Sequence, residues 1–132
     1  MSEIFRSSYA KLPAQDVERA RAFYRDALGF EPVRENHGHL FYECGGASFL
    51  VFPSAGSPSG THDQIGFAVD DIETATASLR DRGVELESYE APPGCSFRDG
   101  IMDYGAVRAA WFKDSEGNLI SLAQFVGERG EG

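Results

Sequence analysis

Histidines and nearby carboxylates are the first residues in this sequence that could do chemistry. His37 and His39 stand two residues apart, close to Glu35 and Glu43, so a strand would place both imidazoles on one face. They lack the HxxxH or HExxH spacing of a helical metal site, and a surface or loop role is favoured over metal binding. His62 lies in a stretch rich in Ser and Gly, where a role beside a turn is favoured over catalysis.

Nucleophilic catalysis has no candidate motif in this sequence. It contains no G-x-S-x-G elbow, no P-loop, no G-x-G-x-x-G between a strand and a helix, and no recognisable Cys-His pair. Asp103 and Tyr104 are candidates for metal-free acid–base chemistry, because an apolar pocket raises the pKa of a carboxyl group. A solvated loop explains this pair more simply. Cys44 and Cys95 lack ligand spacing and are interpreted as packing residues of a protein from a reducing compartment.

The composition is that of a folded, acidic protein. Hydrophobic residues make up 42% and charged residues 25% of the 132 residues, as in an ordinary globular domain. The formal net charge of −9 repels phosphate backbones and anionic lipid headgroups, so neither nucleic acid nor a membrane is expected as a partner. The N-terminal residues hold no apolar signal-peptide core, and no stretch reaches the roughly 18 apolar residues of a membrane span. We therefore expect a cytoplasmic protein.

The chain contains an internal repeat. A shift of 55 residues sets residues 12–26 against residues 67–81, and six of the fifteen positions are identical. Among them are Asp16 and Asp71, the predicted N-caps of two helices. The sequence therefore predicts an α+β fold in which two βαβββ modules form two curved mixed sheets around a cavity. The chain from 1 to 132 is expected as a single domain, with module one at about 5–55, a connector at about 54–63 and module two at about 64–126.

Glycines and alternating residues predict the other elements. Gly29 and Gly83 supply the left-handed residues that end the two helices. Hairpins are predicted at 39–53 and at 107–125, and the alternating stretch 84–89 predicts a strand after the second helix.

Three stretches resemble the vicinal oxygen chelate superfamily, which includes glyoxalase I, bleomycin-resistance proteins, extradiol dioxygenases and fosfomycin-resistance enzymes. They are DVERARAFYRDALGFEP, IGFAVDDIETATASLRDRGVE and the closing WFKDSEGNLISLAQ, which is similar to the D-P-x-G-N-x-I-E-L ending of that family. The resemblance covers nearly the whole chain and implies the two-module fold without selecting one activity. It also implies a homodimer.

The resemblance further implies where a catalytic metal would be held. Catalytic members bind a divalent ion through residues, usually His and Glu, in the first and last strands of each module. In this sequence those positions fall on Tyr9, Leu50, Gln64 and Ser121. Leu50 has no donor atom, and Tyr9 and Ser121 are poor neutral donors, so no metal and no other cofactor is expected.

Strand alternation predicts which neighbours share a face with those positions. Phe52 shares a face with Leu50, while hairpin pairing places Phe41 opposite Leu50 and Trp111 opposite Ser121. These aromatic residues either line a ligand cavity or fill the sheet interface as core. The glycine-punctuated stretch 94–105 is expected to form a mobile flap at the cavity mouth. The predicted ligand-binding residues are Tyr9, Phe41, Leu50, Phe52, Gln64, Asp103, Trp111 and Ser121.

Three classes of function agree with these features. The first hypothesis is a metal-free binding protein, resembling bleomycin-resistance proteins, that sequesters or carries an aromatic or amphipathic small molecule. The alternative is an enzyme of the glyoxalase, dioxygenase or isomerase type with an atypical or absent metal site. A third class is a structural or regulatory protein whose concave face binds another chain. Metal content separates the first two classes, and a cavity filled by its own side chains would favour the third.

Overall fold

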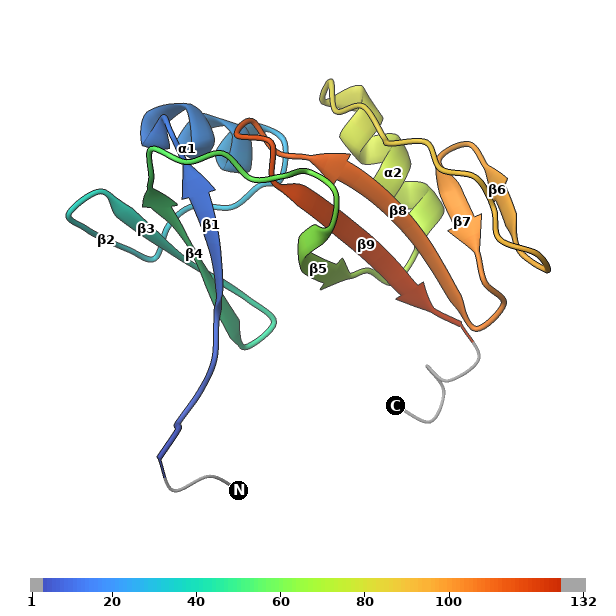
Figure 1. The fold of residues 1–132 in the computed structure, drawn as a ribbon, viewed down its shortest axis with the longest axis horizontal. Helices are drawn as coiled ribbons and strands as arrows, with labels where there is room; N and C mark the ends of the chain where they lie inside the picture. The colour runs from blue at the N-terminus through green and yellow to red at the C-terminus, as the bar shows by residue number, and fades with distance from the viewer. Residues whose placement is uncertain (1–3, 127–132) are drawn as a thin grey trace.

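The computed structural model describes residues 4–126 of the chain, which form two similar halves (Figure 1). The first half consists of β1 (Ala10–Ala14), α1 (Val17–Asp26), β2 (Arg34–Asn36), β3 (His39–Cys44) and β4 (Ala47–Pro53). The second half consists of β5 (Asp63–Ala68), α2 (Ile72–Asp81), β6 (Ser96–Arg98), β7 (Ile101–Asp103), β8 (Val107–Lys113) and β9 (Leu119–Phe125). The sheets are mixed and open, in the orders β1-β4-β3-β2 and β5-β9-β8-β7-β6. The predicted α+β class is confirmed.

Both helices begin where the repeat predicts. The carboxylate of Asp16 accepts a hydrogen bond from the backbone N–H of Arg19 at 3.0 Å, and the carboxylate of Asp71 accepts one from Glu73 at 3.1 Å. Each aspartate therefore satisfies a backbone donor that the first turn leaves unpaired. Gly83, directly after the C-cap of α2, has a φ of +88°, the left-handed conformation that favours glycine.

Both predicted hairpins are confirmed, together with their register. β3 and β4 pair with Phe41 opposite Leu50, and β8 and β9 pair with Trp111 opposite Ser121. The first and last strands of each half lie side by side in parallel, β1 with β4 and β5 with β9. Register within these two hairpins thus follows from the hydrophobic alternation that the sequence displays.

Two predictions for the second half are wrong. Residues 84–89 form no strand and pair with β8 through an isolated bridge between Leu86 and Phe112 and a 2.8 Å hydrogen bond from Glu87 N–H to Trp111 C=O. The stretch 94–105, expected as a loop, contains the antiparallel strands β6 and β7. Both differences have the same cause. β7 pairs with one half of an edge of β8, at Arg108 and Ala109, and only the other half of that edge is left for residues 84–89.

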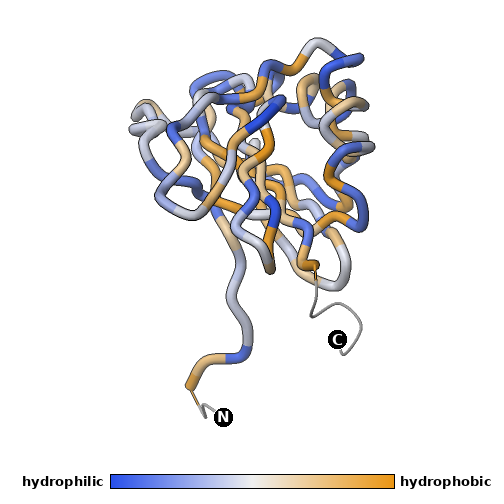
Figure 2. Tube along the Cα trace, turned by 90° about the vertical axis from the view of Figure 1, so that its right-hand side faces the viewer, coloured by the Kyte–Doolittle hydropathy of each residue, from blue (hydrophilic) through white to orange (hydrophobic). Residues whose placement is uncertain are grey.

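The main hydrophobic core lies on the side of each sheet that faces its helix, α1 against β4 and α2 against β8 and β9. Phe67 of β5 joins the two halves, because its ring centroid lies 5.6 Å from those of Phe30 and Phe49. The opposite side of each sheet, called the free face below, stays outside this core. Residues 4–9 lead away from the body of the molecule (Figure 2).

A buried carboxylate fastens the β8–β9 turn to the first half. Oδ2 of Asp114 accepts hydrogen bonds from the Tyr24 hydroxyl at 2.7 Å and from Asn118 Nδ2 at 2.8 Å. Oδ1 accepts from the backbone N–H groups of Glu116 and Asn118, at 2.8 and 2.9 Å. Asn118 Nδ2 also donates to the carbonyl of Pro13 in β1 at 3.0 Å. Burial, with Asp114 beside it, holds the pKa of Tyr24 well above its ordinary value, so its hydroxyl remains a donor.

An Asp114→Asn variant tests this network. It keeps the shape of the side chain but replaces one acceptor oxygen with an NH₂ group that faces two other donors. We expect the free energy of unfolding, measured by urea denaturation, to fall by about 2–4 kcal/mol. The matched control is Asp26→Asn, which alters an exposed carboxylate paired with Arg25 and should leave the urea midpoint nearly unchanged, because solvent screens the pair. Equal losses in the two variants would contradict the role given to Asp114.

An ion pair beside this network makes stability depend on pH. The carboxylate of Glu116 accepts from Nε of Arg19 at 2.8 Å and from the backbone N–H of Asp16 at 3.1 Å. The hydrogen bond from Arg19 lowers the pKa of Glu116 from its ordinary value of 4.5 to about 2. Because the folded state prefers the ionised form, this stabilisation is complete above pH 4.5 and is lost as the pH falls to about 2.

Replacement of Glu116 by Gln tests this dependence. Urea midpoints of the wild-type protein should fall more steeply than those of the variant between about pH 5 and about pH 2.5. Parallel curves for the two proteins over that range would show that the Arg19–Glu116 pair makes no contribution.

Candidate functional site

The free face of the four-stranded sheet combines aromatic rings with cations. The strand register places Arg34, Phe41, Leu50 and Lys11 side by side across β2, β3, β4 and β1. The Arg34 guanidinium lies 4.1 Å from the centroid of the Phe41 ring, and the Lys11 ammonium lies 5.0 Å from that of Phe52. Both distances are within the range of cation–π attraction. The His39 ring stacks on Phe52 with centroids 6.4 Å apart. We call these residues the cationic–aromatic face.

The free face of the five-stranded sheet carries a pocket of about 260 Å³ around Trp111. The Tyr89 ring meets the Trp111 ring edge to face, with centroids 5.2 Å apart. Met102 and Leu119 form buried apolar walls, and Tyr104 is partly exposed at the rim. The pocket also has polar and turn residues, namely Thr61, His62, Asp63, Glu90 and Pro92. We call it the aromatic pocket, and its rings can stack against a planar apolar molecule.

Sequence analysis did not place Tyr89 and Met102 in this pocket. Burial raises the pKa of the Tyr89 hydroxyl, which therefore stays protonated near neutral pH and can donate a hydrogen bond. Tyr89 lies two residues after Glu87, whose backbone N–H donates to the carbonyl of Trp111. That backbone pairing, which brings Tyr89 near Trp111, is the only indication of its place in the pocket. Met102 is paired with Ala109 of β8, and this register depends on the unpredicted strand β7.

Five of the predicted residues lie on the two free faces. Phe41, Leu50 and Phe52 belong to the cationic–aromatic face, and Trp111 and Ser121 are neighbours in the five-stranded sheet. Leu50 is buried, and the other four are half-buried. The strand alternation that predicts these positions is thus reproduced.

Tyr9 and Gln64 lie away from both groups. Tyr9 precedes β1 and is 56% exposed at the edge of a pocket of about 410 Å³ between β1, the β3–β4 turn and β5. Gln64 falls at an irregularity in the pairing of β5 with β9, where the register shifts between Asp63 and Ile65. Gly66, not Gln64, is paired with Ser121, and the same two-residue offset in the first half places Lys11, not Tyr9, beside Leu50.

Asp103 lies on the side of the five-stranded sheet that faces α2. It pairs with Arg108 of β8, whereas its neighbour Met102 lines the aromatic pocket. Successive side chains of a strand point to opposite faces, which is why these two residues separate. Asp103 and Tyr104, suggested by the sequence as an acid–base pair, therefore line different pockets.

The family metal positions do not fit a metal ion. Lys11, not Tyr9, lies directly beside Leu50 in the parallel pair of β1 and β4, and Gly66 lies beside Ser121. A hydrocarbon, a glycine and a protonated amine supply no ligand for a divalent cation, and a serine hydroxyl is a poor neutral one. Among residues 4–126, no group of three or more His, Cys, Asp or Glu side chains is arranged to hold a metal ion. In the same residues no helix is long and apolar enough to cross a bilayer.

Solved structures of several kinds share this fold. TnmS3, an antibiotic binding protein from Streptomyces sp. CB03234, is 25% identical to this chain with a TM-score of 0.68, over 95% of this chain and 99% of its own. The fosfomycin resistance protein FosX from Listeria monocytogenes is 18% identical with a TM-score of 0.70, over 94% and 96%. Lactoylglutathione lyase from Agrobacterium tumefaciens is 21% identical with a TM-score of 0.64, over 90% and 92%. No curated protein matches the sequence.

The family itself follows from the sequence together with this fold. A family profile matches residues 6–122, a span that contains β1 to β8, both helices and the first part of β9. The chain thus belongs to the Glyoxalase/Bleomycin resistance protein/Dioxygenase superfamily.

Proposed function

We propose that this protein is a metal-free binding protein that sequesters or carries an aromatic or amphipathic small molecule. The aromatic pocket is the observation that carries the proposal, because Tyr89 and Trp111 form an edge-to-face pair beside the apolar walls Met102 and Leu119. A planar ligand stacked there would bury apolar area at both of its faces. The antibiotic binding protein TnmS3 shares the fold and supports the same class of function.

The charges on the other free face favour a ligand with an acidic group. The protein has a net charge of −9, yet Lys11 and Arg34 both lie over aromatic rings of the cationic–aromatic face. Neither forms an ion pair with a carboxylate in the described part of the chain. An aromatic anion would contact Phe41 or Phe52 beside these cations, whose positive charge would attract its acidic group.

The proposal includes a homodimer in the cytoplasm. Membership of the superfamily supports the dimer, and the partly open free faces leave room for a second copy. Both cysteines are free thiols, which agrees with a reducing compartment. A solution mass of one 14.4 kDa chain by light scattering would contradict the homodimer.

The alternative function is an enzyme of the glyoxalase, dioxygenase or isomerase type. FosX and lactoylglutathione lyase share the fold, so the fold itself allows this alternative. Leu50 has no donor atom and Ser121 is a poor neutral donor, which argues against a metal-dependent enzyme. Asp103 and Tyr104 line different pockets, so they do not form the acid–base pair suggested by the sequence.

Metal titration separates these two functions. Calorimetric titration of the purified protein with Zn²⁺, Ni²⁺, Mn²⁺ and Fe²⁺ should show no stoichiometric binding, because the family positions lack the imidazole, carboxylate and thiolate donors that these ions need. A matched variant, Leu50→Glu with Ser121→Glu, restores a carboxylate at two of these positions and should bind more metal than the wild-type protein. If the wild-type protein retained a stoichiometric amount of metal after buffer exchange, that result would favour the enzyme alternative.

Two fluorescent probes with similar rings test the proposed ligand class. Anilinonaphthalene sulfonate carries an anionic group, whereas phenylnaphthylamine is neutral. We expect Trp111→Leu to weaken binding of both probes about tenfold, because it removes a stacking surface. The cationic–aromatic face lies on the other sheet, so Arg34→Gln tests it separately. This variant should weaken only the sulfonate bound at that face, about fivefold, because it removes a cation but keeps Phe41.

The control variant is Arg25→Gln, which removes an exposed arginine of α1 and should leave both probes unchanged. Unchanged binding of both probes by Trp111→Leu would contradict the aromatic pocket as the ligand site. An equal effect of Arg34→Gln on both probes would contradict the preference for an anion and leave the binding function intact.

A further inference from the structure

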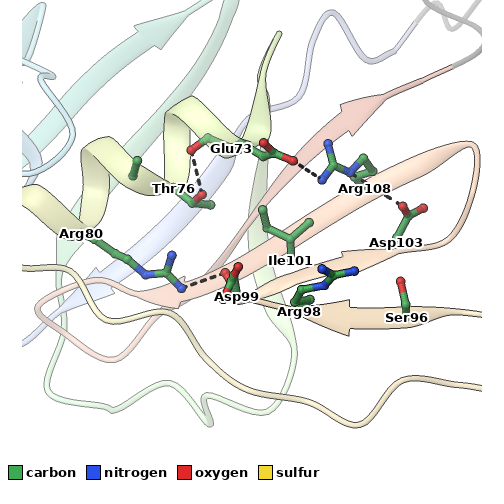
Figure 3. A pocket seen from close by; sticks show the side chains of 10 residues that line it. Glu73, Thr76, Arg80, Ser96, Arg98, Asp99, Ile101, Asp103 and Arg108 are labelled. Atoms are coloured by element: carbon green, nitrogen blue, oxygen red, sulfur yellow. Dashed lines mark hydrogen bonds and ion pairs between the residues drawn. The ribbon is translucent and has the colours of Figure 1, made fainter.

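A second pocket lies on the opposite side of the five-stranded sheet, between α2 and the β6–β7 hairpin (Figure 3). Its volume is about 450 Å³, larger than that of the aromatic pocket. Its walls come from α2, β6, β7 and β8, and the only apolar side chains among them belong to Ala77 and Ile101. Three arginines from three elements converge on it, namely Arg80, Arg98 and Arg108. We call it the arginine pocket.

A tight turn holds the floor of the arginine pocket in place. Asp99 and Gly100 connect the paired residues Arg98 and Ile101 and have φ values of +55° and +81°, as in a type I′ turn. A Cβ atom at Gly100 would stand 2.6 Å from Cδ1 of Leu86, so a larger residue there would require the Leu86 side chain to shift and would be strained by the positive φ. Nη2 of Arg80 donates to the carbonyl of Asp99 at 2.8 Å and ties the hairpin to α2.

The carboxylates of the pocket are mostly occupied by Arg108 and by backbone. Nη2 of Arg108 donates to Glu73 at 2.8 Å, and its Nε lies 3.9 Å from Oδ2 of Asp103. The other oxygen of Asp103 accepts from the backbone N–H of Gly105 at 2.8 Å. The carboxylate of Asp99 is the negative group for which no such contact is seen among residues 4–126.

The arginines of this pocket have more N–H donors than the acceptors around them engage. The side chain of Arg98 makes no hydrogen bond or ion pair with any residue between 4 and 126, although it lines the pocket (Figure 3). Nε of Arg108 is shielded from solvent and has no hydrogen-bond partner within the same residues. Arg80 uses one nitrogen on a neutral carbonyl. A buried donor without a partner is costly, and a ligand oxygen would relieve that cost.

We propose that the arginine pocket binds a small oxyanion, the phosphate or carboxylate group of a polar metabolite. The planar fork of Arg98 can engage two oxygens of such a group at once, and Nε of Arg108 can donate to a third. Because Asp103 and Arg108 alternate with Met102 and Ala109, this site lies back to back with the aromatic pocket and does not overlap it. It is a second site, independent of the proposed aromatic ligand.

Calorimetric titration with inorganic phosphate, and separately with malonate, at low ionic strength tests the arginine pocket. Arg98→Gln should weaken binding about fivefold to tenfold, and it breaks no contact that the fold needs. Asp99→Asn removes the unengaged carboxylate, keeps a residue type that tolerates positive φ, and should tighten binding about threefold. Binding of both anions would indicate a general oxyanion site, and binding of one would identify its preferred group.

Arg25→Gln serves as the matched control, since it removes one arginine elsewhere on the protein. It should bind phosphate and malonate as the wild-type protein does. The proposal is overturned if neither anion binds, or if Arg98→Gln binds them no more weakly than this control. Probe binding by Arg98→Gln should equal that of the wild-type protein, so failure at this pocket is distinguishable from failure of the aromatic ligand proposal.

Discussion

The buried carboxylate of Asp114 is the constraint on which the arrangement of the two halves depends. It sits at the tip of the β8–β9 hairpin and accepts hydrogen bonds from its own turn and from the Tyr24 hydroxyl of α1. A charge can be buried there because both of its oxygens are satisfied by donors. Asn118 extends the contact to the carbonyl of Pro13, so the last hairpin is bonded to both the first strand and the first helix. Phe67 adds an apolar contact between the halves, and together these interactions fix which faces share the core.

This arrangement leaves the free faces of both sheets available for binding. The helix-facing sides carry the shared core, with the arginine pocket beside it, whereas Trp111, Phe52 and Phe41 lie half-buried on the free faces. Of the positions where the resemblance places a metal, Leu50 is paired with Lys11 and Ser121 with Gly66. These faces present aromatic rings and cations held over rings, and under the proposed binding function both would attract a planar organic molecule.

Sequence reasoning predicted the features that depend on local signals. The N-caps Asp16 and Asp71 and the pairs Phe41–Leu50 and Trp111–Ser121 follow from side chains near in sequence or from a single hairpin. It failed where two segments compete for one edge, because alternation in residues 84–89 cannot reveal that β7 occupies half of the β8 edge. The bulge near Gln64 and the face taken by Asp103 were missed for a related reason. A shift of one residue in a strand exchanges its two faces, and no local pattern reports such a shift.

The β6–β7 hairpin shows how one turn can determine two sites. Its two-residue turn at Asp99 and Gly100 fixes the register of β7, which sends Met102 to the aromatic pocket and Asp103 to the arginine pocket. A longer turn would permit the register to slip, and a slip of one residue would put a carboxylate beside Trp111 and a thioether among the arginines. A larger residue at Gly100 would be strained by the positive φ and would require Leu86 to shift, in the segment that brings Tyr89 to Trp111. The composition of both pockets therefore depends on a glycine that lines neither of them.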